Sequence, residues 1–151
     1  MATTVTAASL SVAITESITL NGVDRGSTTT ATIASIGEVS SRIMSITNAE
    51  NGTEIISIST AAGVGTYDKT AVKYLRITNL DDTNYILLQF TDSSSHHWEL
   101  KLEAGKSIIL GDTSSIDDQA DIDNFSASAI AKVIAKADTA AVDIEIYIAS
   151  T

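Results

Sequence analysis

A strict two-residue alternation of apolar and polar side chains is the feature that most constrains this fold. Residues 142–148 read VDIEIYI, and Trp98, Leu100 and Leu102 alternate with charged residues in the same way. Successive side chains of a strand point to opposite faces of a sheet, so this period predicts strands with one buried face. The chain has no proline to interrupt a sheet, and its twenty isoleucines suit a pleated surface. We therefore predict an all-β protein.

The predicted strands succeed one another at short intervals. Roughly eight to ten of them fit the chain, at the spacing of about 8–12 residues that is typical of antiparallel sandwiches and barrels. The 151 residues have the length of one domain, and no linker divides them. We predict a single antiparallel β-sandwich domain over residues 9–151, preceded by a flexible N-terminal arm of residues 1–8. Its core is predicted to include Leu100, Leu102, Ile144 and Ile146.

Turn residues predict where the chain reverses. Asn-Gly pairs at residues 21–22 and 51–52 tolerate the positive φ angles of tight turns. Residues 72–80 are predicted to form a strand and residues 81–83 (DDT) a turn, after which residues 85–91 would pair back as the partner strand of a hairpin.

One segment allows two readings. Residues 127–137 (ASAIAKVIAKA) suit a helix by their Ala and Lys content, but Ile130, Val133 and Ile134 also suit a strand. We favour the strand.

The charge balance limits the partners. A formal net charge of −10 repels nucleic acid and anionic membranes, so we expect neither as a partner. No apolar run approaches the ~18 residues of a membrane span, and the first ten residues do not resemble a signal peptide. The chain has no cysteine, which excludes disulfides and cysteine-based zinc sites.

Few side chains form a pattern that is typical of catalysis or metal binding. Adjacent residues of a strand face opposite ways, so His96 and His97 are not expected to share a metal, and a solvated loop is their simpler interpretation. No G-x-S-x-G nucleophile elbow is present. Residues 111–124 form an acidic loop that lacks the calcium-loop spacing, so we favour a solubilising role over weak calcium binding. Its carboxylates are Asp112, Asp117, Asp118, Asp121 and Asp123. We expect no enzyme activity, no cofactor and no metal.

The second half of the chain carries a resemblance. Residues 74–90 (YLRITNLDDTNYILLQF) and 98–110 (WELKLEAGKSIIL), followed by an acidic loop and a closing strand, resemble the small jelly-roll virion proteins of tailed bacteriophages. The matching positions are Ile77, Asn79, Leu80 and Asp81, then Leu100, Leu102, Gly105, Ser107 and Leu110. The likeness spans about residues 72–148 and implies a jelly-roll-like sandwich. In that family the second motif is a hairpin, and the role is mechanical.

The function that the resemblance implies is that of a virion structural protein. The most specific form is a capsid decoration protein on the capsid surface, which would bridge shell subunits and have the major capsid protein or another virion protein as its partner. We expect a homo-oligomer, a trimer before a dimer, because some strands carry apolar residues on both faces. The arm could add a strand to a neighbouring sheet. Its partner-binding residues would be Met1, Ala2, Thr3, Thr4, Val5 and Thr6.

The alternative is a carbohydrate- or receptor-binding sandwich of a phage tail or fibre. Sugar binding needs exposed aromatic side chains, and alternation places Tyr74 and Tyr147 on outward strand faces. These two tyrosines are therefore the predicted binding residues of this alternative.

Overall fold

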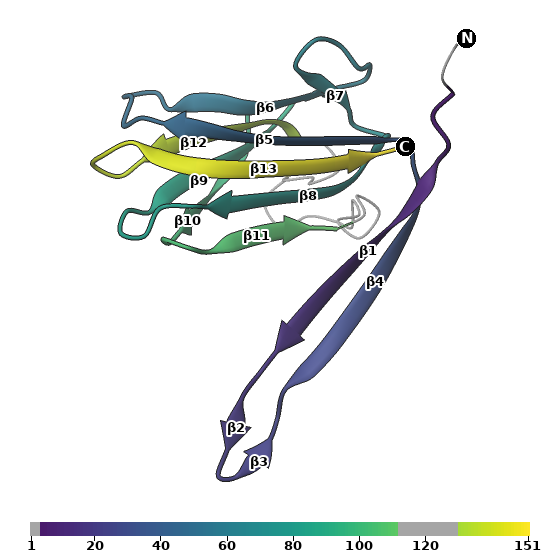
Figure 1. Cartoon of the computed structure of the whole chain (residues 1–151). Coiled ribbons are helices and arrows are strands. Elements are labelled where there is room, and N and C mark those ends of the chain that lie inside the picture. Colours follow the sequence, from purple (N-terminus) through teal and green to yellow (C-terminus); the bar gives the residue numbers. More distant parts are fainter. Residues whose placement is uncertain (1–3, 112–129) are drawn as a thin grey trace.

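The computed structural model describes residues 4–111 and 130–151, so most of the acidic loop and its five aspartates lie outside the described residues. Within those ranges every helix-or-strand element is a strand, which confirms the all-β prediction. Figure 1 shows two parts: a sandwich of two sheets, and a long hairpin that leaves the sandwich at one end.

Two sheets form the sandwich. The four-stranded sheet has the order β11 (Ser107–Leu110), β8 (Val72–Asn79), β13 (Val142–Ser150) and β5 (Glu38–Ile46). The five-stranded sheet has the order β10 (His97–Leu102), β9 (Ile86–Asp92), β12 (Ile130–Ala137), β6 (Thr53–Ser59) and β7 (Thr66–Asp68). Neighbouring strands are antiparallel except for β6 and β7, which are parallel.

The order of the strands is that of a jelly roll. From β5 onward the chain passes back and forth between the two sheets, and only β6–β7 and β9–β10 follow each other within one sheet. When β7 is left aside, four strands face four strands, as in the eight-stranded double Greek key of jelly rolls. The predicted single antiparallel jelly-roll-like β-sandwich is confirmed.

The core lies between the sheets, where alternation predicted it. Val142, Ile144, Ile146 and Ile148 are at most 2% exposed, and Leu102 is 5% exposed. Leu100 is only partly buried, because β10 is the edge strand of its sheet. On the same strand, the Trp98 ring stacks on Phe90 with centroids 4.2 Å apart.

The predicted hairpin of residues 72–80 and 85–91 is wrong. β8 pairs with β11 and β13, whereas β9 pairs with β10 and β12 in the opposite sheet. The connection is a corner between sheets. Buried Asn79 holds it, because its Nδ2 donates to Asn84 O (2.9 Å) and Leu102 O (3.2 Å) while its Oδ1 accepts from Asp81 N (2.9 Å).

The hairpin implied for residues 100–110 is wrong for the same reason. After the turn at Gly105 the chain enters β11, which pairs with β8 and not with β10. Alternation identifies the buried face of a strand, but both a hairpin and a cross-sheet corner satisfy it equally.

Other local predictions hold. Residues 130–137 form strand β12, which confirms the strand interpretation for the described part of residues 127–137. Asn21 and Gly22 both have positive φ (52° and 77°), as a type I′ turn requires. Gly52 has φ 69°, and its N–H donates to Ala49 O at 3.0 Å, which closes the second predicted turn.

The strands of the sandwich begin later than the predicted boundary at residue 9. The first of them is β5, which starts at Glu38. Before it come β1 (Ala8–Glu16), β2 (Thr19–Leu20), β3 (Val23–Asp24) and β4 (Ser27–Ile36), which pair only with one another. These residues, 8–36, form the projecting hairpin of Figure 1, which we call the hairpin arm.

Candidate functional site

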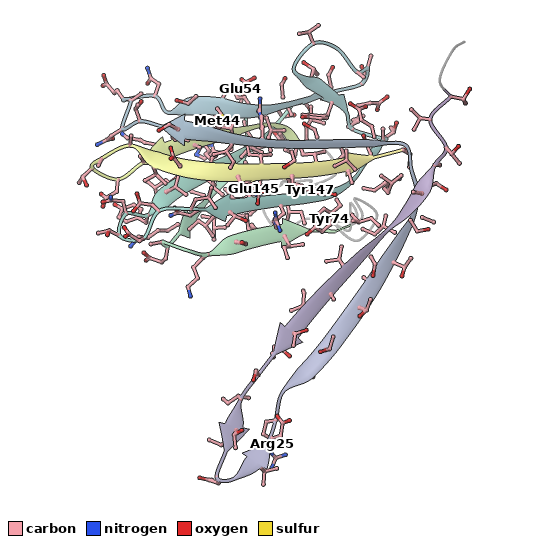
Figure 2. All side chains as sticks on the ribbon, in the orientation of Figure 1. Arg25, Met44, Glu54, Tyr74, Glu145 and Tyr147 are labelled. Atoms are coloured by element: carbon pink, nitrogen blue, oxygen red, sulfur yellow. The ribbon has the colours of Figure 1, made fainter. Side chains whose placement is uncertain are left out.

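The hairpin arm is one continuous two-stranded ribbon. β1 pairs with β4 as far as Glu16 and Ser27, and β2 pairs with β3 from Thr19 and Asp24. Two unpaired residues separate the two ladders on each side of the ribbon, so the register of the second ladder continues that of the first. Arg25 N–H bridges the gap by donating to Ile18 O at 2.9 Å. At about 3.3 Å per residue, β1 and β2 together span roughly 40 Å. Figure 2 shows Arg25 at the far end of the ribbon, well away from the sandwich.

The ribbon has two chemically different faces. Because side chains alternate along each strand and the register is constant from Leu10 to the tip, the large aliphatic residues of the arm fall on one face, which we call the apolar face. They are Leu10, Val12, Ile14, Ile18, Leu20, Val23 and Ile33, and the charged side chains of Glu16 and Arg25 lie among them on the same face. The other face carries small, mostly hydroxyl side chains, and on it Thr15 and Thr28 are hydrogen-bonded at 3.1 Å.

The apolar face is covered only at its base. There Leu10, Val12 and Ile33 pack against a small second core of Ile36, Tyr74 and Ala149, separate from the main core of the sandwich. Further out nothing in the described chain covers it: Ile14 is 50% exposed, Ile18 54%, Leu20 58% and Val23 50%. A lone two-stranded hairpin is marginally stable in water. The outer part of the arm therefore has the properties of an interaction surface that a partner covers.

The outer face of the four-stranded sheet continues this apolar surface. Strand pairing places Val39 and Ile43 (β5), Tyr147 (β13) and Ile109 (β11) on the face opposite the core. Val39 is 51%, Ile43 66% and Ile109 40% exposed. Among the described residues the basic side chain of this face is Arg76, which forms an ion pair with Glu145 and lies over the Tyr147 ring, 5.7 Å from its centroid. Asp143 is its other acidic side chain, so the face combines exposed aliphatic side chains with one net negative charge.

A hollow of about 290 Å³ lies where the arm meets this face. Its lining includes Val12 from the arm, Tyr74 and Arg76 from β8, Ile109 and Tyr147. Tyr74 and Tyr147 contact edge to face, with centroids 6.0 Å apart and an interplanar angle of 78°. Figure 2 shows both tyrosines close to the root of the arm. The hollow joins the base of the apolar face to the outer face of the sheet.

The two predicted sugar-binding tyrosines do lie on the outward face, but they are not equally accessible. Tyr74 is 6% exposed, because the base of the arm lies over it, and burial raises the pKa of its hydroxyl. Tyr147 is half-buried between Tyr74 and Arg76. An accessible aromatic platform at Tyr74 is therefore not present in this chain.

The predicted partner-binding residues at the N-terminus are described only in part. Met1, Ala2 and Thr3 lie outside the described residues, whereas Thr4, Val5 and Thr6 are exposed and belong to no strand, with Val5 72% exposed. Strand addition by these residues stays a prediction.

The hairpin arm itself was missed as a separate unit. A signal for it was present: residues 21–35 contain only two large aliphatic side chains, Val23 and Ile33, too few to line a sandwich core.

The histidine pair lies at a turn of the sandwich. Asp92, at the end of β9, accepts hydrogen bonds from the backbone N–H groups of Ser94 and His96 at 2.8 Å. Its second carboxylate oxygen lies 2.9 Å from His96 Nδ1. Burial by itself would raise the pKa of Asp92, but these hydrogen bonds from His96 and Ser94 outweigh it and lower the pKa below its ordinary value of 3.8. His97 is exposed at the start of β10. This arrangement stabilises the turn between β9 and β10.

The described residues offer neither a metal site nor a membrane-spanning helix. Residues 4–111 and 130–151 contain no cluster of three or more His, Cys, Asp or Glu side chains that could hold a metal ion. No helix in the same part of the chain is long and apolar enough to cross a membrane.

The surface that stands out is thus the apolar face of the arm together with the outer face of the four-stranded sheet. Comparison of the chain with protein-family models, with curated proteins and with solved structures finds no match.

Proposed function

We propose that this protein is a structural subunit of a larger protein assembly, and in its most specific form a decoration protein of a bacteriophage capsid. The observation that carries the proposal is the hairpin arm, which extends beyond the sandwich with Ile14, Ile18, Leu20 and Val23 half exposed on one face. Unpaired apolar faces of this kind mark protein interaction sites. The resemblance of residues 72–148 to small virion proteins suggests which assembly.

The sandwich and the arm suit different tasks in such a subunit. The sandwich has a complete core of its own, with residues such as Ile46, Ile77 and Val133 fully buried. It can fold before it meets a partner. The arm lengthens the reach of the subunit by roughly 40 Å along an extended ribbon. A clamp that bridges shell subunits needs both a stable body and an extended contact, since the contact must cross a boundary between neighbours.

The test uses purified particles and a shortened arm. Particles that lack the protein are mixed with the full chain or with a tip-shortened variant, in which residues 14–29 are replaced by Asn-Gly to close the hairpin at Ala13 and Thr30. We expect the full chain to co-sediment with the particles and to raise the temperature at which they release their genome. The shortened variant should do neither, because it lacks most of the exposed apolar face.

Two results would each contradict one part of the proposal, the role of the arm or the role of the protein. One is equal binding of both variants to particles, which would remove the arm from the mechanism. The other is binding to glycans with no binding to any particle, which would move the function to a carbohydrate- or receptor-binding sandwich.

A further inference from the structure

We infer that the apolar face of the hairpin arm docks on the outer face of the four-stranded sheet of a second copy of this chain. Each copy would then give one arm and receive one, and the copies would close into a symmetric oligomer. This inference deepens the proposed function, because it states how subunits join one another, and it rests on that proposal only for its biological setting.

The two uncovered surfaces are continuous with a contact that already exists within one chain. At its base, the apolar face already packs on the outer face of the sheet of its own chain, where Leu10 and Val12 meet Tyr74. Beyond that contact the same face continues with Ile14 and Ile18, while the sheet continues with exposed Ile43 and Val39. The two uncovered surfaces are therefore extensions of two surfaces that already fit each other.

Charge is compatible with contact between these two surfaces. The chain carries ten net negative charges, so two copies repel each other as whole molecules. On the arm, the positive charge of Arg25 balances one of the two negative charges of Glu16 and Asp24. On the outer face of the sheet, Arg76 likewise balances one of the two negative charges of Asp143 and Glu145. One net negative charge thus remains on each surface. Both surfaces are therefore close to neutral, so a second copy of the same acidic chain can meet either of them without strong repulsion.

The opposite face of the sandwich is different in composition. The outer face of the five-stranded sheet carries Lys132 and Lys136 on β12 and Glu99 and Lys101 on β10, opposite the inward residues of those strands. Leu87 is its exposed large aliphatic residue, at 37%. Such a mixed, charged face is typical of a solvated surface, so the two sheets of the sandwich are not equivalent as docking sites.

The first experiment measures mass. Sedimentation of the full chain at micromolar concentration and moderate salt should give a multiple of 15.8 kDa. Ile14→Lys on the arm and Ile43→Lys on the sheet should each weaken association by at least about a hundredfold, because an apolar contact leaves the ammonium group unpaired.

Matched controls add the same charge elsewhere. Thr30→Lys lies on the hydroxyl face of the arm, where Thr30 pairs with Ala13, the residue before Ile14. Leu87→Lys lies on the outer face of the five-stranded sheet. Both should leave association within about threefold of the unmodified chain. Equal loss in controls and test variants would overturn the inference, as would a monomer at every concentration.

A second experiment tests which surfaces meet. Since the chain has no cysteine, single variants can be cross-linked without background. A mixture of Ile14→Cys chains and Ile43→Cys chains should form a disulfide-linked pair under mild oxidation, because these residues would lie in one contact. A mixture of Thr30→Cys and Leu87→Cys chains should not. Failure of the first mixture to cross-link in an oligomer of confirmed mass would overturn the inference.

The two proposals fail separately. Chains that stay monomeric yet decorate particles would refute arm exchange and keep the structural role. Chains that exchange arms but bind no particle would keep the exchange and refute the decoration role.

Discussion

Isoleucines that share one face of an extended segment occur both in the sandwich and in the hairpin arm, but they have opposite environments. Ile144 and Ile146 are at most 1% exposed, whereas Ile14 and Ile18 are 50% and 54% exposed. Both pairs lie on one face of an extended chain segment, although Ile14 and Ile18 are four residues apart with Glu16 between them. The difference is that a second sheet covers the first pair and nothing in the described chain covers the second. The comparison separates side chains that stabilise the fold from side chains that are available for a partner.

The largest expected effect comes from truncating the two kinds of isoleucine. Ile144→Ala should lower the free energy of unfolding by about 2–5 kcal/mol, because it leaves a cavity between the sheets. Ile14→Ala should change it by no more than about 0.5 kcal/mol, because the side chain is half exposed. Denaturant unfolding of both variants, each in the Ile43→Lys background where we expect single chains, measures the difference. Similar losses would mean that the arm is part of the cooperative fold.

Two glycines with the same backbone conformation allow a second comparison. Gly52 and Gly22 both have positive φ. A Cβ at Gly52 would lie 2.6 Å from Ile134 Cγ2, whereas a Cβ at Gly22 would have no neighbouring atom within 4 Å. Gly52→Ala should cost about 1–3 kcal/mol of sandwich stability from backbone strain, and the clash adds to this. Gly22→Ala should strain only the tip of the arm. Calorimetry should therefore show a lower melting temperature for the first variant alone.

The turn at Asp92 should make the sandwich sensitive to acid. Folding lowers the pKa of this carboxyl below 3.8, so its ionised form stabilises the folded state fully above that value. The contribution is lost as the pH falls through the lower pKa of the folded state. Asp92→Asn should therefore melt at a lower temperature than the unmodified chain at pH 7. The difference in melting temperature between the two chains should narrow below a pH of about 4. Asp82→Asn, on an exposed turn, is the control and should show no such gap.

The smallest expected effect is that of shortening the arm. The tip-shortened variant loses no side chain of the main core and keeps Leu10, Val12 and Ile33 at the base. In the Ile43→Lys background its melting temperature should stay within about 2 °C, since a surface change contributes little to stability. Thermal unfolding followed by circular dichroism measures this. A fall of ten degrees in melting temperature would show that the arm contributes to the stability of the sandwich, and the two regions would then not differ as described.

Much of the fold could be predicted from local patterns. The alternation of residues 142–148 identified the inward residues of β13, and Asn-Gly at residues 21–22 identified the tip of the arm. The strand at residues 130–137 was also predicted, although its composition suits a helix. Each of these depends on neighbours in sequence, where side-chain direction and turn conformation are decided.

The candidate site was predicted less well. Tyr74 was placed correctly on an outward face, but its burial depends on Leu10 and Val12, which lie more than sixty residues earlier in the chain. The arm was predicted as residues 1–8, whereas the projecting element is residues 8–36. Apolar alternation is the same whether a ribbon joins a sandwich or leaves it, so the pattern alone could not separate these outcomes.

The sequence by itself determined that the chain forms strands, which face of each strand is apolar and where the tight turns lie, because these properties follow from side-chain chemistry over a few residues. Only the tertiary structure decided which strands pair, that residues 79–85 turn a corner between sheets, and that one ribbon stays outside the sandwich. Pairing joins residues far apart in the chain, and the burial that favours one arrangement over another exists only once both sheets are present.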